Sequence, residues 1–396
     1  MHLVYTGEEA PQSFTKSMFL AGPSPRNHAD PNWREEAVKI LEELDYEGVV
    51  FLPIWRDGPQ DTKTHDYDSQ VDWENKYLEM ADCVVFWVPR DLKVLPAFTT
   101  NVEFGLWLNS GKAVLGYPPG AEKMRYLDWQ AGQHGVPVLT TLKETLEQAI
   151  QNMGWGALRI GGEREVPLFI WEKPEFQSWY KAQTGAGNRL DGCKVVWTFR
   201  VGKNKERLFL WALHVDVWIA AEDRHKTNEI VLFRPDISTI VAYTHAEWDE
   251  ELDNHESLLD TTIAIVKEFR SPAVSEDGYI RELPGGSALK GDKDPLAVAA
   301  EELEEETGVV LDPSRFRFVD ARQIAGTLSA HYAHVFAVEL TAEEMKELED
   351  DSEVHGVEED TERTYVETYR LGDLLNGDVD WANMGMIMSA LLRPPV

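Results

Sequence analysis

The 396-residue chain has little that would cross-link it or anchor it. Its only cysteines, Cys83 and Cys193, form neither a disulfide framework nor a CxxC metal motif. A reducing, cytoplasmic location is therefore expected. The N-terminal stretch has no basic region followed by an apolar run, so we expect no signal peptide. The most apolar run, residues 208–221, is interrupted by His214 and Asp216, which argues against a membrane span.

Basic residues are scarce as well. The chain has 38 Lys and Arg against 70 Asp and Glu, a net charge of -32. Such a charge repels phosphate backbones, so we expect no binding of nucleic-acid polymers. A small anionic ligand would need local Arg or Lys side chains, or a bridging metal ion. The hydrophobic content of 43% is enough for two or three domains with their own cores.

Residues 1–152 have the pattern of an α/β domain. From residue 17 to about 150, short apolar runs such as CVVFWVP alternate with stretches of helical spacing. Strict alternation predicts a parallel sheet with helices on both faces. Ligands of such sheets bind at the carboxyl ends of the strands. Those ends carry the Gly- and Pro-rich stretches AGPSPR, PIWRDG and YPPG.

The remainder of the chain has a different rhythm. Residues 153–190 contain a Gly-rich stretch, which we interpret as a linker, and an aromatic-rich connecting segment. Residues 191–396 show many strand-like runs around one prominent helix at about 295–306, and end in a further helix. This pattern predicts an α+β domain in which a mixed sheet is sandwiched by helices.

The prominent helix contains the stretch EELEEETG, residues 301–308. Glu302, Glu305 and Glu306 are spaced so that they share one helix face. Three carboxylates on one face provide the oxygen ligands that Mg²⁺ or Mn²⁺ prefers. The alternative is a solvated acidic helix in an acidic protein. Asp294 is expected to cap the start of the helix and Gly308 to end it.

The stretch ELPGG followed by ELEEETGV resembles the Nudix box, and its surroundings look most like the ADP-ribose pyrophosphatase branch of that family. The resemblance implies Mg²⁺-dependent hydrolysis of a nucleoside diphosphate linked to another group. It makes Glu302, Glu305 and Glu306 the metal ligands, with Glu305 also catalytic, and the position of the family's Arg is Glu301 here.

Further site residues in this half follow from the resemblance. Glu282 and Gly286 belong to its strand and loop and would contact substrate, and Arg270 could bind a substrate phosphate bidentately. A later acid, Glu358, Glu359 or Glu362, would be the general base. The sequence does not choose among the three, and Glu359 is the one included in the predicted site.

In the first half, Glu103 lies near the start of a predicted helix that Thr100 would cap, at the ligand edge of the sheet. A carboxylate there can act as a nucleophile or stabilise an oxocarbenium ion when an N-glycosidic bond breaks. Asp91, after a strand end, could serve as an acid or a substrate contact. Asp82 precedes a buried strand and could be either catalytic or a local cap. The alternative for Glu103 is an acid favoured by the helix dipole.

The stretches FLAGP, VVFLP, VVFWVPR, TTNVEFG and SGK resemble the nucleoside 2-deoxyribosyltransferase-like family over residues 17–150. The resemblance implies a flavodoxin-like α/β domain with Glu103 as the glycosyl nucleophile and Asp82 at the family's strand-start position. Gly22, Pro23 and Arg26 would frame a sugar or a phosphate.

Together these features predict a bifunctional enzyme that acts on a small nucleoside or nucleotide and that could form a homo-oligomer. One half would cleave or transfer at the base–sugar bond, and the other would cleave a diphosphate. Two alternatives stay open. The altered box could bind a nucleotide without turnover, as a sensor, or the first domain could serve only for ligand binding.

Overall fold

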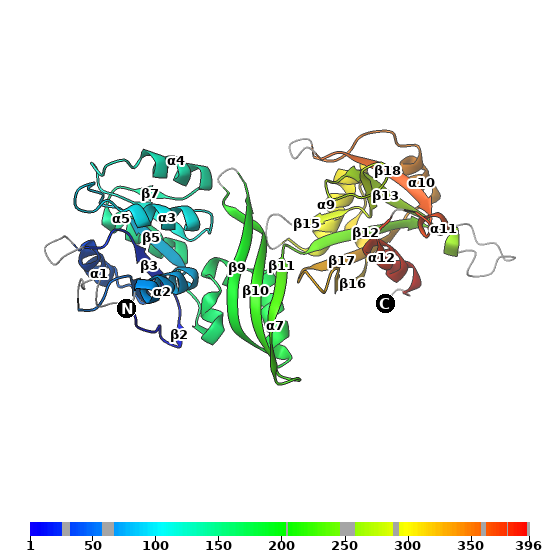
Figure 1. The fold of residues 1–396 in the computed structure, drawn as a ribbon. Helices are drawn as coiled ribbons and strands as arrows, with labels where there is room; N and C mark the ends of the chain where they lie inside the picture. Colours follow the sequence, from blue (N-terminus) through cyan, green and yellow to red (C-terminus); the bar gives the residue numbers. More distant parts are fainter. Residues whose placement is uncertain are drawn as a thin grey trace. The chain divides into compact units, whose positions relative to one another are not determined.

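The computed structural model describes residues 1–25, 32–57, 67–202, 205–245, 258–287, 293–357, 362–377 and 379–393. The chain divides into two compact units, Met1–Phe233 and Arg234–Val396. Figure 1 shows the elements of both units, and each unit is described by itself. Three residues discussed above, Arg26, Glu358 and Glu359, lie outside the described residues.

The first unit is built on a parallel sheet with the order β1-β4-β3-β5-β6-β7. Apart from the edge strand β1, this is the 2-1-3-4-5 order of flavodoxin-like sheets. The α/β prediction is therefore confirmed. The strands are β1 (His2–Tyr5), β3 (Ser17–Ala21), β4 (Val49–Leu52), β5 (Cys83–Trp87), β6 (Ala113–Gly116) and β7 (Val138–Leu139).

Helices cover both faces of this sheet, as alternate side chains of each strand require. Phe19 faces one core, which contains residues of α2, α3 and α4, while Met18 faces the other, which contains residues of α1 and α5. This is why β3 and β5 are buried throughout. The helices are α1 (Trp33–Glu43), α2 (Tyr67–Met80), α3 (Phe98–Trp107), α4 (Arg125–His134) and α5 (Leu142–Met153).

Local sequence sets the helix ends. The Asn32 side chain accepts a hydrogen bond from the Arg34 N–H at the start of α1, and Thr141 caps α5 in the same way. Thr100 is not a cap: α3 begins at Phe98, after Ala97 in a left-handed conformation, and Thr100 is buried within the helix.

The segment after α5 is folded rather than a linker. Arg159 is fully buried, so the Gly-rich stretch 154–167, interpreted as a linker, is packed into the unit. Phe176, in the aromatic segment that follows, is fully buried as well. The elements after α5 are β8 (Arg159–Ile160), which pairs with β2 (Ser13–Phe14), then η1 (Gly161–Glu165), α6 (Leu168–Trp171) and α7 (Pro174–Gly185).

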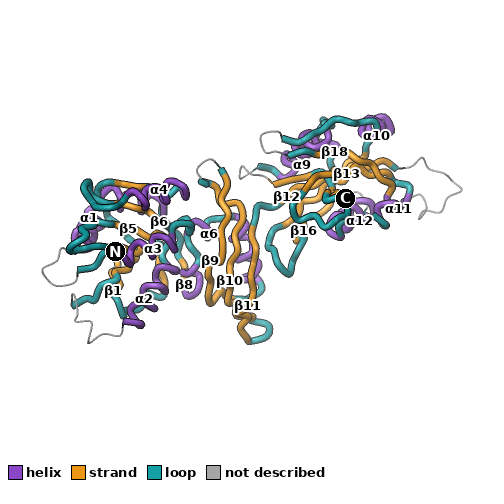
Figure 2. The backbone as a smooth tube through the Cα atoms, turned by 45° about the horizontal axis from the view of Figure 1, so that its top comes forward, coloured by secondary structure: helices purple, strands orange, loops and turns teal. Residues whose placement is uncertain are grey.

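A second sheet completes this unit, with the order β11-β10-β9 (Figure 2). Its aromatic side chains pack on α7: Phe176 and Trp179 contact Phe233, which stacks on Trp211. The division between the units therefore falls after Phe233, whereas the change of rhythm in the sequence falls at residue 191. The strands are β9 (Arg189–Val201), β10 (Arg207–Ile219) and β11 (Arg224–Phe233).

The second unit holds a mixed sheet with the order β14-β13-β12-β17-β16, to which β15 and β18 are added at β12 and β13. The pair β12–β17 is parallel, and the others are antiparallel. The strands are β12 (Ile237–Thr244), β13 (Thr262–Phe269), β14 (Tyr279–Glu282), β15 (Gly285–Ser287), β16 (Arg317–Gln323), β17 (Tyr332–Glu339) and β18 (Thr364–Arg370).

Helices cover both faces of the mixed sheet, so the predicted α+β arrangement is present. Ile240 faces a core with residues of α9 and α10, and Val241 faces a core with residues of α11 and α12. Asp294 caps α9 and Gly308 ends it in a left-handed conformation, as expected. The helices are α9 (Pro295–Thr307), η2 (Pro313–Arg315), α10 (Ala342–Glu349), α11 (Leu371–Leu374) and α12 (Trp381–Leu392).

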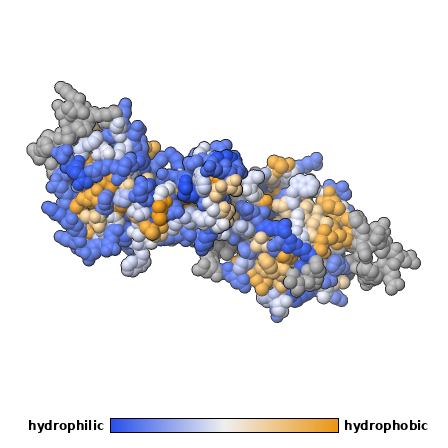
Figure 3. All heavy atoms as spheres, turned by 90° about the horizontal axis from the view of Figure 1, so that it is seen from below, coloured by the Kyte–Doolittle hydropathy of each residue, from blue (hydrophilic) through white to orange (hydrophobic). Residues whose placement is uncertain are grey.

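Within the described ranges, no helix has both the length and the apolar character needed to cross a membrane. On the face of the molecule seen in Figure 3, hydrophilic residues predominate and hydrophobic residues gather in separate patches.

Candidate functional site

A cavity of about 290 Å³ lies at the carboxyl ends of β3, β4 and β5. This is the point where the strand order reverses, the usual ligand position in doubly wound sheets. The predicted residues Gly22, Pro23 and Glu103 all line it. The other lining residues are Ser24, Pro53, Tyr67, Gln70, Glu74, Leu95, Pro96, Ala97, Phe98, Thr99 and Thr100.

Gly22 forms the floor of the turn that follows β3. Its φ of +152° is one that L side chains rarely adopt, and a Cβ there would lie 2.2 Å from the carbonyl oxygen of Trp87. The residue must therefore be glycine so that β3 can leave the sheet beside the end of β5. This close approach brings Pro23 to the cavity.

Arg34, on α1, stabilises the same turn through hydrogen bonds. Its guanidinium is fully buried and donates to the carbonyl oxygens of Leu20 at 3.0 Å and Gly22 at 2.8 Å, and to Ser24 Oγ at 3.2 Å. Burial lowers the pKa of Arg34 to about 10, and the carboxylates of Glu103 and Glu74 oppose that change. Arg34 is thus a buried cation that fixes the turn and balances the acids nearby.

Glu103 and Glu74 are the acids of the cavity, from α3 and α2. The pKa of Glu103 is raised to about 7, mainly by burial and further by the charge of Glu74, while Arg34 lowers it. Burial also raises the pKa of Glu74, which accepts a hydrogen bond from the Gln70 amide at 2.9 Å. Glu103 lies beyond the first turn of α3, so the helix dipole does not account for it.

Burial raises the pKa of both carboxylates, and the charge of Glu74 adds to the effect on Glu103. Once ionised, a buried carboxylate such as Glu103 can attack an electrophilic carbon, and its charged neighbour sets the pH at which it does so. Sequence reasoning found Glu103 but missed Glu74 and Arg34. The one feature of the sequence that could have identified Arg34 and Glu74 is that they lie on the helices that follow β3 and β4. Many other residues share that feature, so it is a weak indication.

Asp82 lies elsewhere, and its geometry contradicts a catalytic role. Its side chain is fully enclosed and forms a two-pronged ion pair with Arg159, at 2.6 and 2.8 Å. It also accepts hydrogen bonds from Ser17 N–H at 2.8 Å and Leu168 N–H at 3.0 Å. Asp82 therefore ties the start of β5 to β3 and to the segment after α5.

Asp91 is exposed and does not line the cavity. Its Oδ1 accepts the N–H groups of Lys93 at 2.8 Å and Val94 at 3.1 Å, and these hydrogen bonds lower its pKa. Asp91 caps a turn, so its predicted role as acid or substrate contact is wrong for this geometry.

In the second unit, the ELPGG loop packs directly on α9. Glu306 is buried and accepts the Gly285 N–H at 2.8 Å, and a Cβ on Gly286 would lie 2.4 Å from Glu302 Oε1. The Glu302 carboxylate therefore lies directly against the backbone of Gly286. Glu305, by contrast, is exposed, and Glu302 is half-buried.

Arg270 lies among carboxylates of this unit. Its guanidinium is 2.7 Å from Glu268, 3.5 Å from Glu282 and 3.7 Å from Glu362. In this arrangement it neutralises protein acids, and a phosphate would have to compete with them.

The acids around Arg270 and α9 repel one another. Burial, followed by the charges of Glu305 and Glu362, raises the pKa of Glu302 to about 7. Burial likewise raises the pKa values of Glu268, Glu282 and Glu306. The donor atoms and the excess charge suit a divalent cation. In the described part of the chain, however, no three such side chains are arranged so that they could hold a metal ion.

The first unit is thus an α/β domain with a paired-carboxylate cavity at its switch point. Residues 15–121 match the family model described as nucleoside 2-deoxyribosyltransferase like. This match supports the similarity of the N-terminal part of the chain to that family. The matched range contains Gly22, Arg34, Glu74 and Glu103.

A comparison with curated proteins finds no matching sequence. The family match ends at residue 121, so the Nudix resemblance of the second half stays a prediction based on its sequence.

Proposed function

We propose that the first unit breaks or transfers the N-glycosidic bond of a nucleoside or nucleotide. The observation that carries the proposal is the pairing of Glu103 with Glu74 in the cavity at the ends of β3 and β5. The family match supports the substrate class. Asp82 and Asp91 have no part in this mechanism.

The ionised Glu103 carboxylate attacks the anomeric carbon of the sugar, and the bond to the base breaks with its electron pair on the base nitrogen. The departing base takes its proton from solvent, because Glu74 is the ionised neighbour whose charge raises the pKa of Glu103. A second base, or water, then attacks the same carbon, gives its proton to solvent and releases Glu103. When water attacks, the reaction is hydrolysis; when a base attacks, it is transfer. Gly22 and Pro23 border the space for the sugar.

The test is release of free base from a panel of 2′-deoxynucleosides and ribonucleosides, followed by chromatography. We expect release or exchange by the full chain and a loss of about a thousandfold or more in Glu103→Gln, as befits removal of a nucleophile. Asp91→Asn is the matched control, because Asp91 caps a turn away from the cavity. Equal rates in Glu103→Gln and the wild type would reject the proposal.

We propose a second activity for the other unit: hydrolysis of a nucleoside diphosphate-linked compound of the ADP-ribose type, dependent on Mg²⁺ or Mn²⁺. The observation that favours it is the group of buried and half-buried acids, Glu268, Glu282, Glu302 and Glu306, whose pKa values all rise without a cation. The resemblance makes Glu302, Glu305 and Glu306 the ligands of a metal that would polarise the phosphates. Their side chains are not grouped around one point in the described structure, so they would have to reorient to bind it. Glu282 and Gly286 would border the substrate.

Incubation of the full chain with Mg²⁺ and ADP-ribose, NAD or nucleoside triphosphates tests this second activity. Phosphate-containing products that disappear in Glu305→Gln support hydrolysis. Tight nucleotide binding without product, in the wild type, would instead support the sensor alternative.

A further inference from the structure

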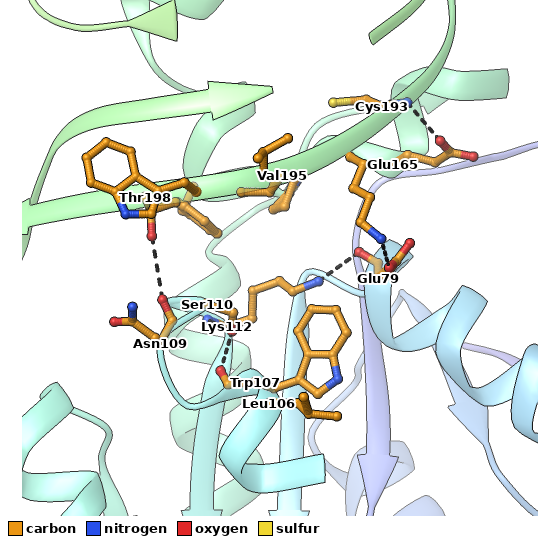
Figure 4. A pocket seen from close by; sticks show the side chains of 15 residues that line it. Glu79, Leu106, Trp107, Asn109, Ser110, Lys112, Glu165, Cys193, Val195 and Thr198 are labelled. Carbon is orange, nitrogen blue, oxygen red and sulfur yellow. Dashed lines mark hydrogen bonds and ion pairs between the residues drawn. The ribbon is translucent and has the colours of Figure 1, made fainter. Parts of the chain in front are cut away.

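The first unit contains a second cavity, also of about 290 Å³, which the mechanism above does not use. It lies under β9, between the end of α3 and the segment around α6. Figure 4 shows the side chains that line it and labels ten of them. The lining residues are Glu79, Leu106, Trp107, Asn109, Ser110, Lys112, Glu165, Pro167, Phe169, Cys193, Lys194, Val195, Val196, Trp197 and Thr198.

The walls of this cavity are largely aromatic and aliphatic. Trp107, Phe169 and Trp197 come from three different elements. Large apolar side chains at its lining also remain open to solvent: Leu106 is 72% exposed and Val196 is 54% exposed. One face of each ring is already covered: Lys112 lies over Trp107, Arg200 lies over Phe169, and Trp197 stacks on Phe199. A flat ring is the occupant that would gain most from stacking on the faces that these partners leave open.

Charged groups gather at one end of the cavity (Figure 4). The Glu165 carboxylate accepts the Cys193 N–H at 2.8 Å through Oε2. Within the described part of this unit it has no other hydrogen bond. Burial raises its pKa, while the Cys193 N–H and the charge of Arg164 lower it. A carboxylate in this position offers Oε1 to an N–H donor on a ligand.

The cations at this end are already engaged. The Lys112 ammonium donates to the carbonyl oxygens of Leu78 at 2.8 Å and Glu79 at 2.7 Å, and Lys194 pairs with the Glu79 carboxylate at 2.5 Å. The charged group that is left to bind a ligand at this end is therefore a hydrogen-bond acceptor, the Glu165 carboxylate. An anionic ligand would meet Glu165 and Glu79, whereas a neutral ring that carries N–H groups complements them.

We propose that this second cavity binds a flat, nitrogen-containing heteroaromatic molecule, of the class of free nucleobases, with a ring or exocyclic N–H directed at Glu165. The inference does not rest on the proposed N-glycosidic activity, because it concerns binding alone. The two cavities share their helices: α2 carries Glu74 in the first and Glu79 in the second, and α3 carries Glu103 in the first and Trp107 in the second.

The test is titration of the full chain with adenine and with cytosine, measured by calorimetry and by quenching of tryptophan fluorescence. Two variants change the second cavity. Glu165→Gln removes its charge, and Leu106→Trp fills its mouth from an exposed position, so that folding is retained. A third variant, Glu103→Gln, changes only the first cavity. Thermal unfolding checks each variant.

We expect saturable binding of at least one base to the wild type and to Glu103→Gln. Binding should weaken about tenfold or more in Glu165→Gln, since a hydrogen bond to a charged group is lost, and should weaken comparably in Leu106→Trp. Two results would overturn the proposal: no saturable binding of either base to the wild type, or binding that Glu103→Gln abolishes and Leu106→Trp leaves unchanged. Because the readout is binding, failure of the N-glycosidic activity is recognised separately.

Discussion

The charge of Glu74 raises the pKa of Glu103, although the two residues belong to different helices and lie far apart in the sequence. Both line the cavity at the switch point of the parallel sheet. Arg34, buried beneath the adjoining turn, opposes the effect. This coupled group of two acids and one cation is the basis of the first predictions below.

The rate of base release should depend on pH through this pair. The pKa of Glu103 is about 7, so the carboxylate becomes ionised, and able to attack, as the pH rises through about 7. The rate at limiting substrate should therefore rise over that interval. The rising limb should move to lower pH in Glu74→Gln, because that variant removes a like charge. A limb that stays in place would contradict the electrostatic coupling.

Glu103 should also cost stability. Its folded-state pKa of about 7 lies above the ordinary value of 4.5, so between these pH values the folded protein holds a proton that the unfolded chain has released. Stability therefore falls as the pH rises from about 4.5 to about 7 and then levels off. Glu103→Gln should remove this fall and raise the free energy of unfolding at pH 8 by up to roughly 3 kcal/mol. Urea unfolding at several pH values measures it, with the exposed Glu304→Gln as control. A variant less stable than the wild type at pH 8 would count against the assigned burial.

The Asp82–Arg159 pair should be structural. Asp82→Asn leaves the Arg159 guanidinium in a fully enclosed site without its counter-ion, and this should lower the free energy of unfolding by about 3–5 kcal/mol. A double variant, Asp82→Asn with Arg159→Met, should recover part of that loss, because no charge is left buried. Denaturant unfolding of the wild type, Asp82→Asn, Arg159→Met and the double variant gives the interaction free energy between the two side chains. Unchanged stability together with a large loss of turnover in Asp82→Asn would restore the catalytic interpretation.

Divalent cations should stabilise the second unit in a pH-dependent way. Glu302 has a pKa of about 7 without metal, so protons compete with the cation below that value. The increase in melting temperature produced by Mg²⁺ should grow between pH 6 and pH 8. Glu302→Gln and Glu306→Gln should reduce it, while Glu301→Gln, on an exposed side chain that pairs with Lys293, should not. An increase that is the same in all three variants would point to binding elsewhere.

Much of the fold follows from sequence pattern. The buried runs of β3 and β5, the capped helices α1, α5 and α9, and the mixed sheet of the second unit match the periodicities of their segments. The short strand β1 and the helix α4 have weaker patterns and were missed. Residues 153–185 contain many glycines in their first part, yet Arg159 and Phe176 make the segment part of a core.

The site was predictable only in part. Glu103 and Gly22 follow directly from strand-end motifs, since the carboxyl ends of parallel strands meet at one edge. Glu74 and Arg34 reach the same place from helices whose polar side chains carry no local sign of burial. Asp82 shows the opposite case: the family resemblance made it a site residue, but it lies at the amino end of β5, away from the ligand edge. Its partner Arg159 comes from a distant segment that sequence spacing does not reveal.

The most direct test of the central claim is mass analysis of the protein during turnover. The full chain is mixed with a 2′-deoxynucleoside, quenched in acid within the first turnovers, and digested. The account predicts a deoxyribosyl adduct on the α3 peptide that contains Glu103, absent in Glu103→Gln, together with release of free base. Base release that continues in Glu103→Gln, with no adduct on that peptide in the wild type, would contradict it.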